Sequence, residues 1–174
     1  MVRLFSFSFA ALAVSSLFAL EGRVQKSGAE RIVVSIETAD NGPAAKAFNR
    51  SLRRNLGISG HFRVGPNGQI KVTGTPGAGV TAVGVGKQVK TSAAFSDDKA
   101  ARQAAREFSD AIVQAHTGKK GFANDRIAFV DRKGKDNAEL YVCYPDGYDI
   151  RQLTSDHRAA VGPRWTPNKQ EIYY

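Results

Sequence analysis

Hydrophobic and polar residues alternate along the first half of the chain in patterns that predict a strand followed by a helix. Residues 31–36 are rich in β-branched side chains and predict a buried strand. Pro43 suits the first position of a helix, where its fixed φ and missing N–H do no harm. Gly57 supplies a stop for that helix. One buried stripe is expected at helical spacing, on Ala45, Phe48, Leu52 and Leu56.

Short strands are predicted after this helix. Residues 61–64 and 69–72 flank Pro66-Asn67-Gly68, which predicts a β-hairpin. The glycine-rich residues 77–86 invite comparison with a phosphate-binding loop. However, Thr81 stands where that motif requires its first glycine, and Gln88 stands where it requires Ser or Thr. We therefore interpret residues 83–86 as a strand with a bend or bulge and expect no nucleotide site.

The clearest helical pattern lies between Ser96 and Gly118. Ser96 is expected to cap the helix, and Asp97 and Asp98 favour the positive end of its dipole. Gly118 is expected to end it, with lysines beside the negative end. Two amphipathic helices among short strands predict a two-layer α/β (α+β) domain with the helices on a mixed sheet. The expected packing stripe consists of Ala101, Ala104, Ala105, Phe108, Ala111, Ile112 and Ala115.

From Asp125 onward the pattern changes to short strands at close intervals, with turn sequences between them. This change predicts an all-β unit. The expected strands are residues 126–130, 139–143, 151–154 and 171–174. The expected turns are residues 133–137, 145–147 and 163–169.

The amino terminus has the pattern of a secretory signal peptide. Arg3 gives a positive start, the run of residues 4–20 is apolar, and Glu21-Gly22-Arg23 ends that run. The run is too short and too rich in serine for a membrane-spanning helix. We therefore expect export, with residues 1–20 as the signal peptide and residues 21–30 as a flexible segment.

Composition adds few constraints. A hydrophobic fraction of 42% supports a globular core. The formal charge of +9 suits an acidic partner, nucleic acid or an anionic membrane surface, but solubility alone also explains it. The densest basic cluster consists of Arg50, Arg53 and Arg54. It has two possible interpretations, a phosphate-binding site or a solvated face of the helix. Cys143 is the only cysteine, which excludes an internal disulfide and predicts a buried strand residue.

Catalytic patterns are weak. His61, His116 and His157 are not spaced as metal ligands, and no nucleophile elbow is present. Ser155-Asp156-His157 holds the residue types of a catalytic triad, but neighbours on one loop rarely reach the required geometry. We expect no enzymatic activity, no cofactor and no metal.

The β region carries four short sequences in a fixed order: Leu140-Tyr141-Val142, Asp146-Gly147-Tyr148, Arg151-Gln152-Leu153-Thr154 and Pro163-x-Trp165-x-Pro167. Together they resemble the WD40-like repeat of TolB-type propellers. Residues 111–130 resemble the junction between the amino-terminal domain of the TolB family and its first blade, and residues 48–62 are similar to the first helix of that domain and the strand after it.

The resemblance implies a TolB-like amino-terminal domain at residues 31–122 and a truncated first propeller blade at residues 123–174. It also implies a non-catalytic periplasmic protein of the Tol-Pal system, associated with outer-membrane integrity, cell division and protein import. The implied partners are a Pal-like lipoprotein and a TolA-like inner-membrane protein, and no partner-binding residue can be carried over. The alternatives are the propeller region of a peptidase and, less compatible with export, a nucleic-acid-binding domain.

Overall fold

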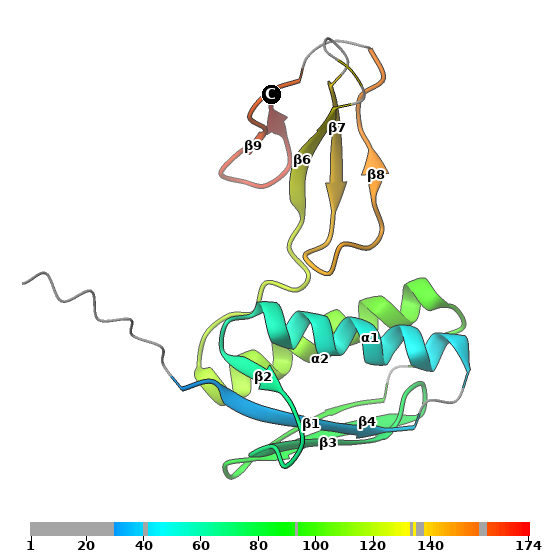
Figure 1. Cartoon of the computed structure of the whole chain (residues 1–174), viewed down its shortest axis with the longest axis vertical. Coiled ribbons are helices and arrows are strands. Elements are labelled where there is room, and N and C mark those ends of the chain that lie inside the picture. The colour runs from blue at the N-terminus through cyan, green and yellow to red at the C-terminus, as the bar shows by residue number, and fades with distance from the viewer. Residues whose placement is uncertain (1–29, 40–41, 93, 133, 135–137, 157–159) are drawn as a thin grey trace, which may run out of the picture.

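The computed structural model describes residues 30–174 except 40–41, 93, 133, 135–137 and 157–159. A layer of two helices lies between a five-stranded sheet and a smaller β unit (Figure 1). The predicted signal peptide, residues 1–20, and nearly all of residues 21–30 lie outside the described residues. In the described ranges, no helix combines the length and apolar character needed to cross a membrane.

The large sheet is mixed, with strand order β2-β1-β3-β4-β5. β1 runs parallel to both of its neighbours, whereas β3, β4 and β5 form an antiparallel meander. The predicted strand at residues 31–36 is therefore the centre of the parallel part. The strands are β1 (Ile32–Thr38), β2 (Phe62–Val64), β3 (Ile70–Thr75), β4 (Gly79–Gly84) and β5 (Lys87–Thr91).

The predicted hairpin of residues 61–64 and 69–72 is wrong, because β1 lies between β2 and β3. Val34 pairs with Val64 on one side and with Ile70 on the other. The connecting segment steps across β1, where the Gly65 N–H donates to the Val34 carbonyl oxygen at 3.0 Å. Pro66-Asn67-Gly68 still forms a turn, in which Asn67 has φ 52°. However, β3 runs in the same direction as β2, since both are parallel to β1, and the two strands do not form a hairpin.

The glycine-rich segment forms strand and turn, and the next element is the strand β5. Val83 and Gly84 belong to β4, as predicted, but Val85 and Gly86 form the turn to β5. Their φ angles are 50° and 70°, which are typical of a tight type I′ hairpin turn. The strand predicted through Gly86 therefore ends two residues earlier.

Helix α1 (Pro43–Ile58) begins at the predicted proline, and all four residues of its predicted stripe are buried. Its end differs from the prediction, because Gly57 is helical and the cap is Ser59. Gly60, with φ 78°, takes the left-handed conformation beyond the helix. The helix runs two residues further than predicted, through Ile58, because Gly57 tolerates helical angles as well as left-handed ones.

Helix α2 (Asp98–Thr117) ends at Gly118, which has the predicted left-handed conformation with φ 71°. Its cap is Asp97 and not Ser96, since the Asp97 carboxylate accepts a hydrogen bond from the Ala100 N–H at 2.8 Å. Both residue types suit this position, and the backbone places Asp97 at the boundary.

The two helices pack on each other and on one face of the sheet around aromatic rings. Phe48 lies 5.8 Å from Phe95 and 6.3 Å from Phe108, measured between ring centroids. In the predicted α2 stripe, Ala111 is exposed and Ala115 is half-buried, whereas Arg106 is buried. The buried face of α2 therefore differs from the predicted stripe of small residues: it includes Arg106 and excludes Ala111.

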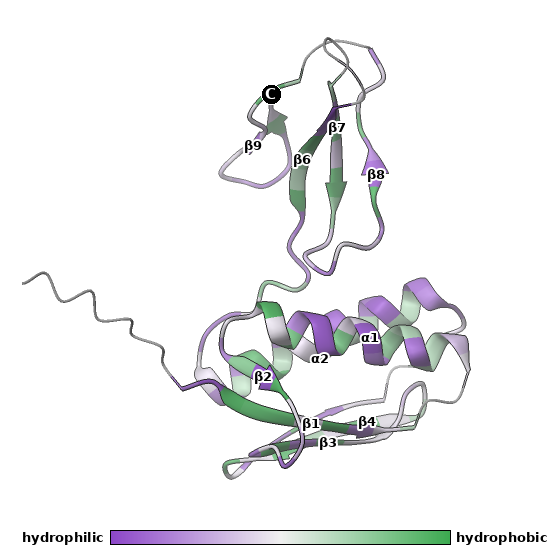
Figure 2. Cartoon of the chain, viewed as in Figure 1, coloured by the Kyte–Doolittle hydropathy of each residue, from purple (hydrophilic) through white to green (hydrophobic). Residues whose placement is uncertain are grey.

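The β unit consists of a three-stranded antiparallel sheet, in order β6-β7-β8, and a short antiparallel pair, β9 and β10. Figure 2 shows β6 and β7 as largely hydrophobic strands. The predicted turn at residues 163–169 is present, since the Lys169 N–H donates to the Thr166 carbonyl oxygen at 2.8 Å. Most of the predicted turn at 133–137 lies outside the described residues. The strands are β6 (Ile127–Arg132), β7 (Ala138–Cys143), β8 (Arg151–Gln152), β9 (Arg164–Trp165) and β10 (Ile172–Tyr173).

Candidate binding surfaces

The turn between β7 and β8 holds the β unit on the helices. The Gly147 N–H donates to the Tyr144 carbonyl oxygen at 2.8 Å, and Gly147 and Asp149 both have positive φ, at 77° and 55°. Glycine adopts that conformation without strain, and aspartate tolerates it better than most residues. This tight geometry directs the carboxylates of Asp146 and Asp149 toward α2, where both meet Arg106.

Arg106 is the centre of a buried polar cluster at this junction. The residue is 1% exposed, its Nη1 lies 3.2 Å from Asp146 Oδ2, and its Nη2 lies 3.0 Å from Asp149 Oδ2. Its guanidinium carbon lies 3.7 Å from the centroid of the Tyr144 ring. On α1, Ser51 donates to Asp146 Oδ2 at 2.6 Å. We call Ser51, Arg106, Tyr144, Asp146 and Asp149 the junction cluster.

The junction cluster joins three elements that are distant in the sequence. Burying an ion pair removes both charges from water, so such a pair is stable only when its members satisfy each other. Here two carboxylates and an aromatic face surround one guanidinium, and the Ser51 hydroxyl binds one of those carboxylates. Arg102 adds a weaker contact, 3.5 Å from Asp149 Oδ1. The junction cluster therefore fixes how the β unit sits on the helices.

Sequence reasoning did not find this cluster. Arg106 was indistinguishable from the other basic residues of an amphipathic helix, and Asp146 was noted only as part of a turn and of the propeller repeat. The one available signal was position, because Arg106 lies directly after Ala105 on the apolar side of the pattern.

A cleft with a cationic lining lies beside the junction cluster. Its volume is about 400 Å³. Residues of α2 form one side, and residues of the β unit form the other. We call this site the cationic cleft. Its lining residues are Lys99, Gln103, Arg106, Arg126, Tyr144, Asp149, Ile150 and Arg151.

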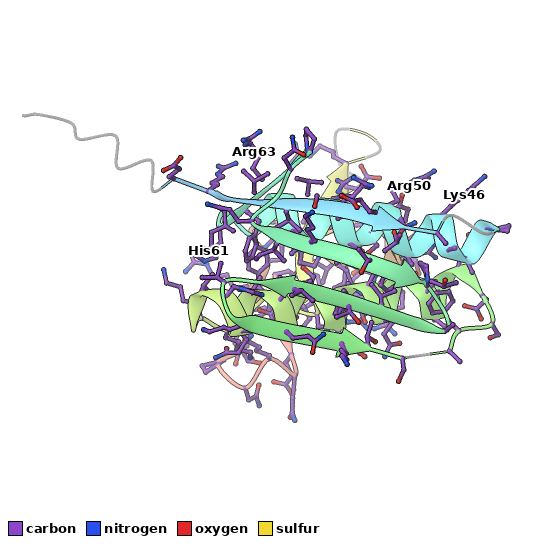
Figure 3. All side chains as sticks on the ribbon, turned by 90° about the horizontal axis from the view of Figure 1, so that it is seen from below. Lys46, Arg50, His61 and Arg63 are labelled. Atoms are coloured by element: carbon purple, nitrogen blue, oxygen red, sulfur yellow. The ribbon has the colours of Figure 1, made fainter. Side chains whose placement is uncertain are left out.

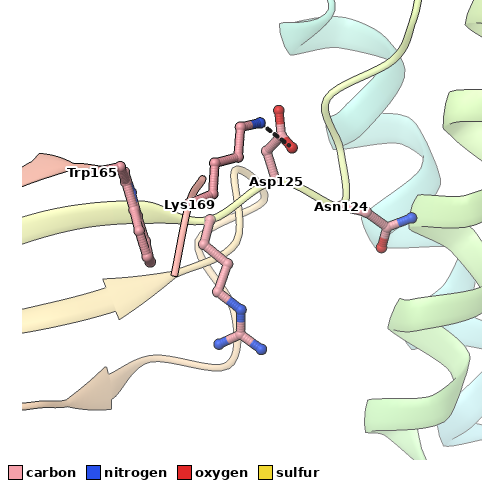
Figure 4. A pocket seen from close by; sticks show the side chains of 5 residues that line it. Asn124, Asp125, Trp165 and Lys169 are labelled. Carbon is pink, nitrogen blue, oxygen red and sulfur yellow. Dashed lines mark hydrogen bonds and ion pairs between the residues drawn. The ribbon is translucent and has the colours of Figure 1, made fainter. Parts of the chain in front are cut away.

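A second hollow, of about 340 Å³, lies between the segment before β6 and the β9–β10 pair (Figure 4). Lys169 Nζ lies 3.2 Å from Asp125 Oδ1 across it, and both side chains are well exposed. An exposed ion pair of this kind contributes little to stability. Trp165 lines the hollow, and its Nε1 is buried with no hydrogen-bond partner among the described residues.

The arginines of α1 do not all converge on one site: Arg50 and Arg53 line a hollow of about 390 Å³ to which Arg54 does not contribute. Arg53 Nη2 donates to the Ile36 carbonyl oxygen of β1 at 2.9 Å, whereas Arg54 lies beside Gly147 of the β unit. Lys46 and Arg50 project from the helix surface (Figure 3). This geometry favours the interpretation as a solvated helix face.

The histidines and the cysteine form no cluster in the part of the chain that the structure describes, and no group of His, Cys, Asp or Glu there is arranged to hold a metal ion. His61 lies beside Phe62, His116 lies on α2, and His157 lies outside the described residues. Burial and the nearby charge of Lys87 lower the pKa of His116.

Cys143 ends strand β7 and is half-buried, where the sequence predicted a buried side chain. Burial raises the pKa of its thiol, Asp146 raises it further, and Arg54 opposes them. The thiol therefore stays protonated at neutral pH, which lowers its reactivity as a nucleophile.

The fold and the junction define a class of protein: a two-layer α/β domain with a β unit docked on its helices through buried charges. No family model matches the chain. The chain is 27% identical, over 180 residues, to the Tol-Pal system protein TolB of Chromobacterium violaceum, an alignment that covers 84% of this chain and 42% of that protein. The crystal structure of TolB from Acinetobacter baumannii matches with a TM-score of 0.65 at 23% identity, over 82% of this chain and 43% of that one.

These findings confirm the predicted resemblance: the chain is TolB-like over most of its length. The structural match establishes the fold, which is that of the corresponding part of TolB. The chain spans less than half the length of the relatives it matches.

Proposed function

We propose that the chain is a non-catalytic, protein-binding component of a Tol-Pal system that works in the periplasm. The observation that carries this proposal is the similarity to a Tol-Pal system protein over 84% of the chain. The similarity includes both the α/β domain and the junction to the β unit, so it extends beyond a shared propeller repeat.

In this proposal residues 31–122 are the amino-terminal domain and residues 123–174 are the start of the first propeller blade. Support comes from the antiparallel order β6-β7-β8 and from the exposed apolar side chains of the β unit. A blade within a propeller covers such side chains with its neighbours. Examples are Ile127, Leu153, Val161 and Tyr173.

The proposed partners are a Pal-like lipoprotein and a TolA-like inner-membrane protein. Through them the protein supports the integrity of the outer membrane and the constriction of the envelope at division. Residues 1–20 serve as the signal peptide, and residues 21–30 remain available to a partner. We assign no partner contact to a particular residue on the basis of the resemblance.

The experiment is a chemical cross-linking and purification of the native protein from the periplasm of its own cells, with an affinity tag at the chromosomal locus. Mass spectrometry is expected to identify the Pal-like and TolA-like proteins in the eluate, and the exported chain is expected to begin near Glu21. A variant that lacks residues 4–20 is the control and is expected to lose both partners. Recovery of neither partner from correctly exported protein would contradict the proposal.

A further inference from the structure

The cationic cleft carries an excess of positive charge that the protein itself leaves uncompensated. Four of its lining side chains are cationic, and Asp149 is the one carboxylate among the described lining residues. Asp149 is already engaged by Arg106 at 3.0 Å and by Arg102 at 3.5 Å. Lys99 and Arg151 are exposed, and no ion pair involves either of them among the described residues.

A second observation points to a missing ligand. Arg106 is 1% exposed and uses both of its Nη atoms in the junction cluster, but its Nε has no hydrogen-bond partner among the described residues. A buried donor without an acceptor destabilises a structure. Arg106 lines the cleft, so its unpartnered N–H adds to the positive potential that an anionic ligand would meet there.

The cleft also presents an aromatic ring and an apolar side chain. Two guanidinium groups lie close to the Tyr144 ring, that of Arg106 at 3.7 Å and that of Arg126 at 4.7 Å from the ring centroid. Arg126 Nη2 also donates to the Tyr144 hydroxyl at 3.1 Å, which holds this arginine in position. Ile150 is 62% exposed in the same lining. A free phosphate ion would use the charges and leave this apolar surface uncovered.

We propose that the cationic cleft binds an acidic peptide segment of a protein partner. Its carboxylates contact Lys99, Arg126 and Arg151, and an adjacent apolar side chain packs on Ile150 and Tyr144. The inference rests on the proposed function only in taking the partner to be a protein. Because Lys99 belongs to α2 and Arg151 to β8, a bound segment bridges the two parts of the chain.

Fluorescence anisotropy with a fluorescein-labelled peptide of alternating glutamate and leucine tests this site on the full chain. The test variant is K99E/R151E, since neither side chain belongs to the junction cluster. The matched control is R63E/K71E, which makes the same change in net charge at exposed residues of β2 and β3. We expect the test variant to bind at least about tenfold more weakly and the control to change by less than about threefold. Circular dichroism confirms that both variants are folded.

The inference would be overturned by no binding of the peptide to the wild-type chain, by equal loss of affinity in the two variants, or by displacement of the peptide by inorganic phosphate at matched charge. A peptide of alternating glutamate and serine is expected to bind more weakly, and equal affinity would also overturn it. The same variants enter the cross-linking experiment. If the wild-type chain recovers the Pal-like and TolA-like proteins but K99E/R151E binds the peptide as tightly as wild type, this inference alone is contradicted. If the wild-type chain recovers neither partner, the proposed function is contradicted.

Discussion

At the scale of single residues, Val85 occupies a backbone conformation that suits it poorly. It has φ 50° in the turn between β4 and β5, and its side chain is 72% exposed, so packing does not compensate. A β-branched residue in the left-handed region is strained, and Asn-Gly is the preferred pair for this kind of turn. The sequence already supplies Gly86 at the second position.

Val85→Asn is therefore expected to raise the free energy of unfolding by about 1 kcal/mol. Urea denaturation measures the change. Val83→Asn is the control, because Val83 is also partly exposed but lies in β4, where asparagine is unfavourable. An unchanged or lower midpoint for V85N would show that the turn is not strained.

His116 makes stability depend on pH. Its pKa in the folded chain is lowered from 6.5 by burial and by Lys87, so the unfolded chain binds a proton here before the folded chain does. Stability is therefore highest at a pH above the pKa of His116 in the unfolded chain. It decreases as the pH falls from that value toward the lower pKa of His116 in the folded chain. We expect wild-type stability to decrease more than that of His116→Gln on acidification from about pH 7.5 to 5.5. Parallel decreases in the two denaturation series would contradict this assignment.

At the scale of elements, the sequence predicted structure well wherever local chemistry decides it. Pro43 begins α1 and Gly118 ends α2, as expected. The strands of the β unit lie between the predicted turn sequences. Prediction from the sequence failed where a segment distant in the chain determines the structure. Nothing local to residues 61–72 shows that β1 lies between the two strands, since pairing depends on which edges the rest of the sheet leaves open. The junction cluster was missed for the same reason.

The crossing over β1 requires a close backbone approach at Gly68. A Cβ there would overlap the backbone nitrogen of Ser35, whereas a Cβ on Gly65 would meet its nearest atom at 3.5 Å. Gly68→Ala is expected to destabilise the protein by about 2 kcal/mol or more, and Gly65→Ala by less than about 1 kcal/mol. Denaturant midpoints of the two variants measure the difference. Equal midpoints would show that the crossing segment moves away freely.

At the scale of the whole molecule, a small polar cluster joins two parts that share little apolar surface. The α/β domain has its own core around Phe48 and Phe108, whereas Leu140 and Val142 are buried within the β unit. The contacts across the junction are mainly polar or charged: Arg106 contacts Asp146 and Asp149, and Arg102 contacts Asp149 and the Tyr148 ring. The junction cluster therefore controls docking more than it controls the fold of either part.

Arg106→Met leaves Asp146 buried without its cation and is expected to lower the free energy of unfolding by about 3 kcal/mol. Arg102→Met is the matched control on the same helix. Its contact with Asp149 is longer, at 3.5 Å, and Asp149 keeps its pair with Arg106, so the loss should be smaller, at about 1 kcal/mol. Hydrogen exchange locates the effect, because loss of docking should accelerate exchange in β7 and β8 more than in α1. Equal acceleration throughout the chain would instead indicate global unfolding.

The position of the only tryptophan has a practical consequence for optical measurements. Trp165 lies in β9, whereas both helices of the described residues lie between Pro43 and Thr117. Indole emission therefore reports on the β unit, and the far-ultraviolet helical signal reports on the α/β domain. Two coincident unfolding curves would mean that the chain melts as one cooperative unit, and separated curves would give each part its own free energy without any added label.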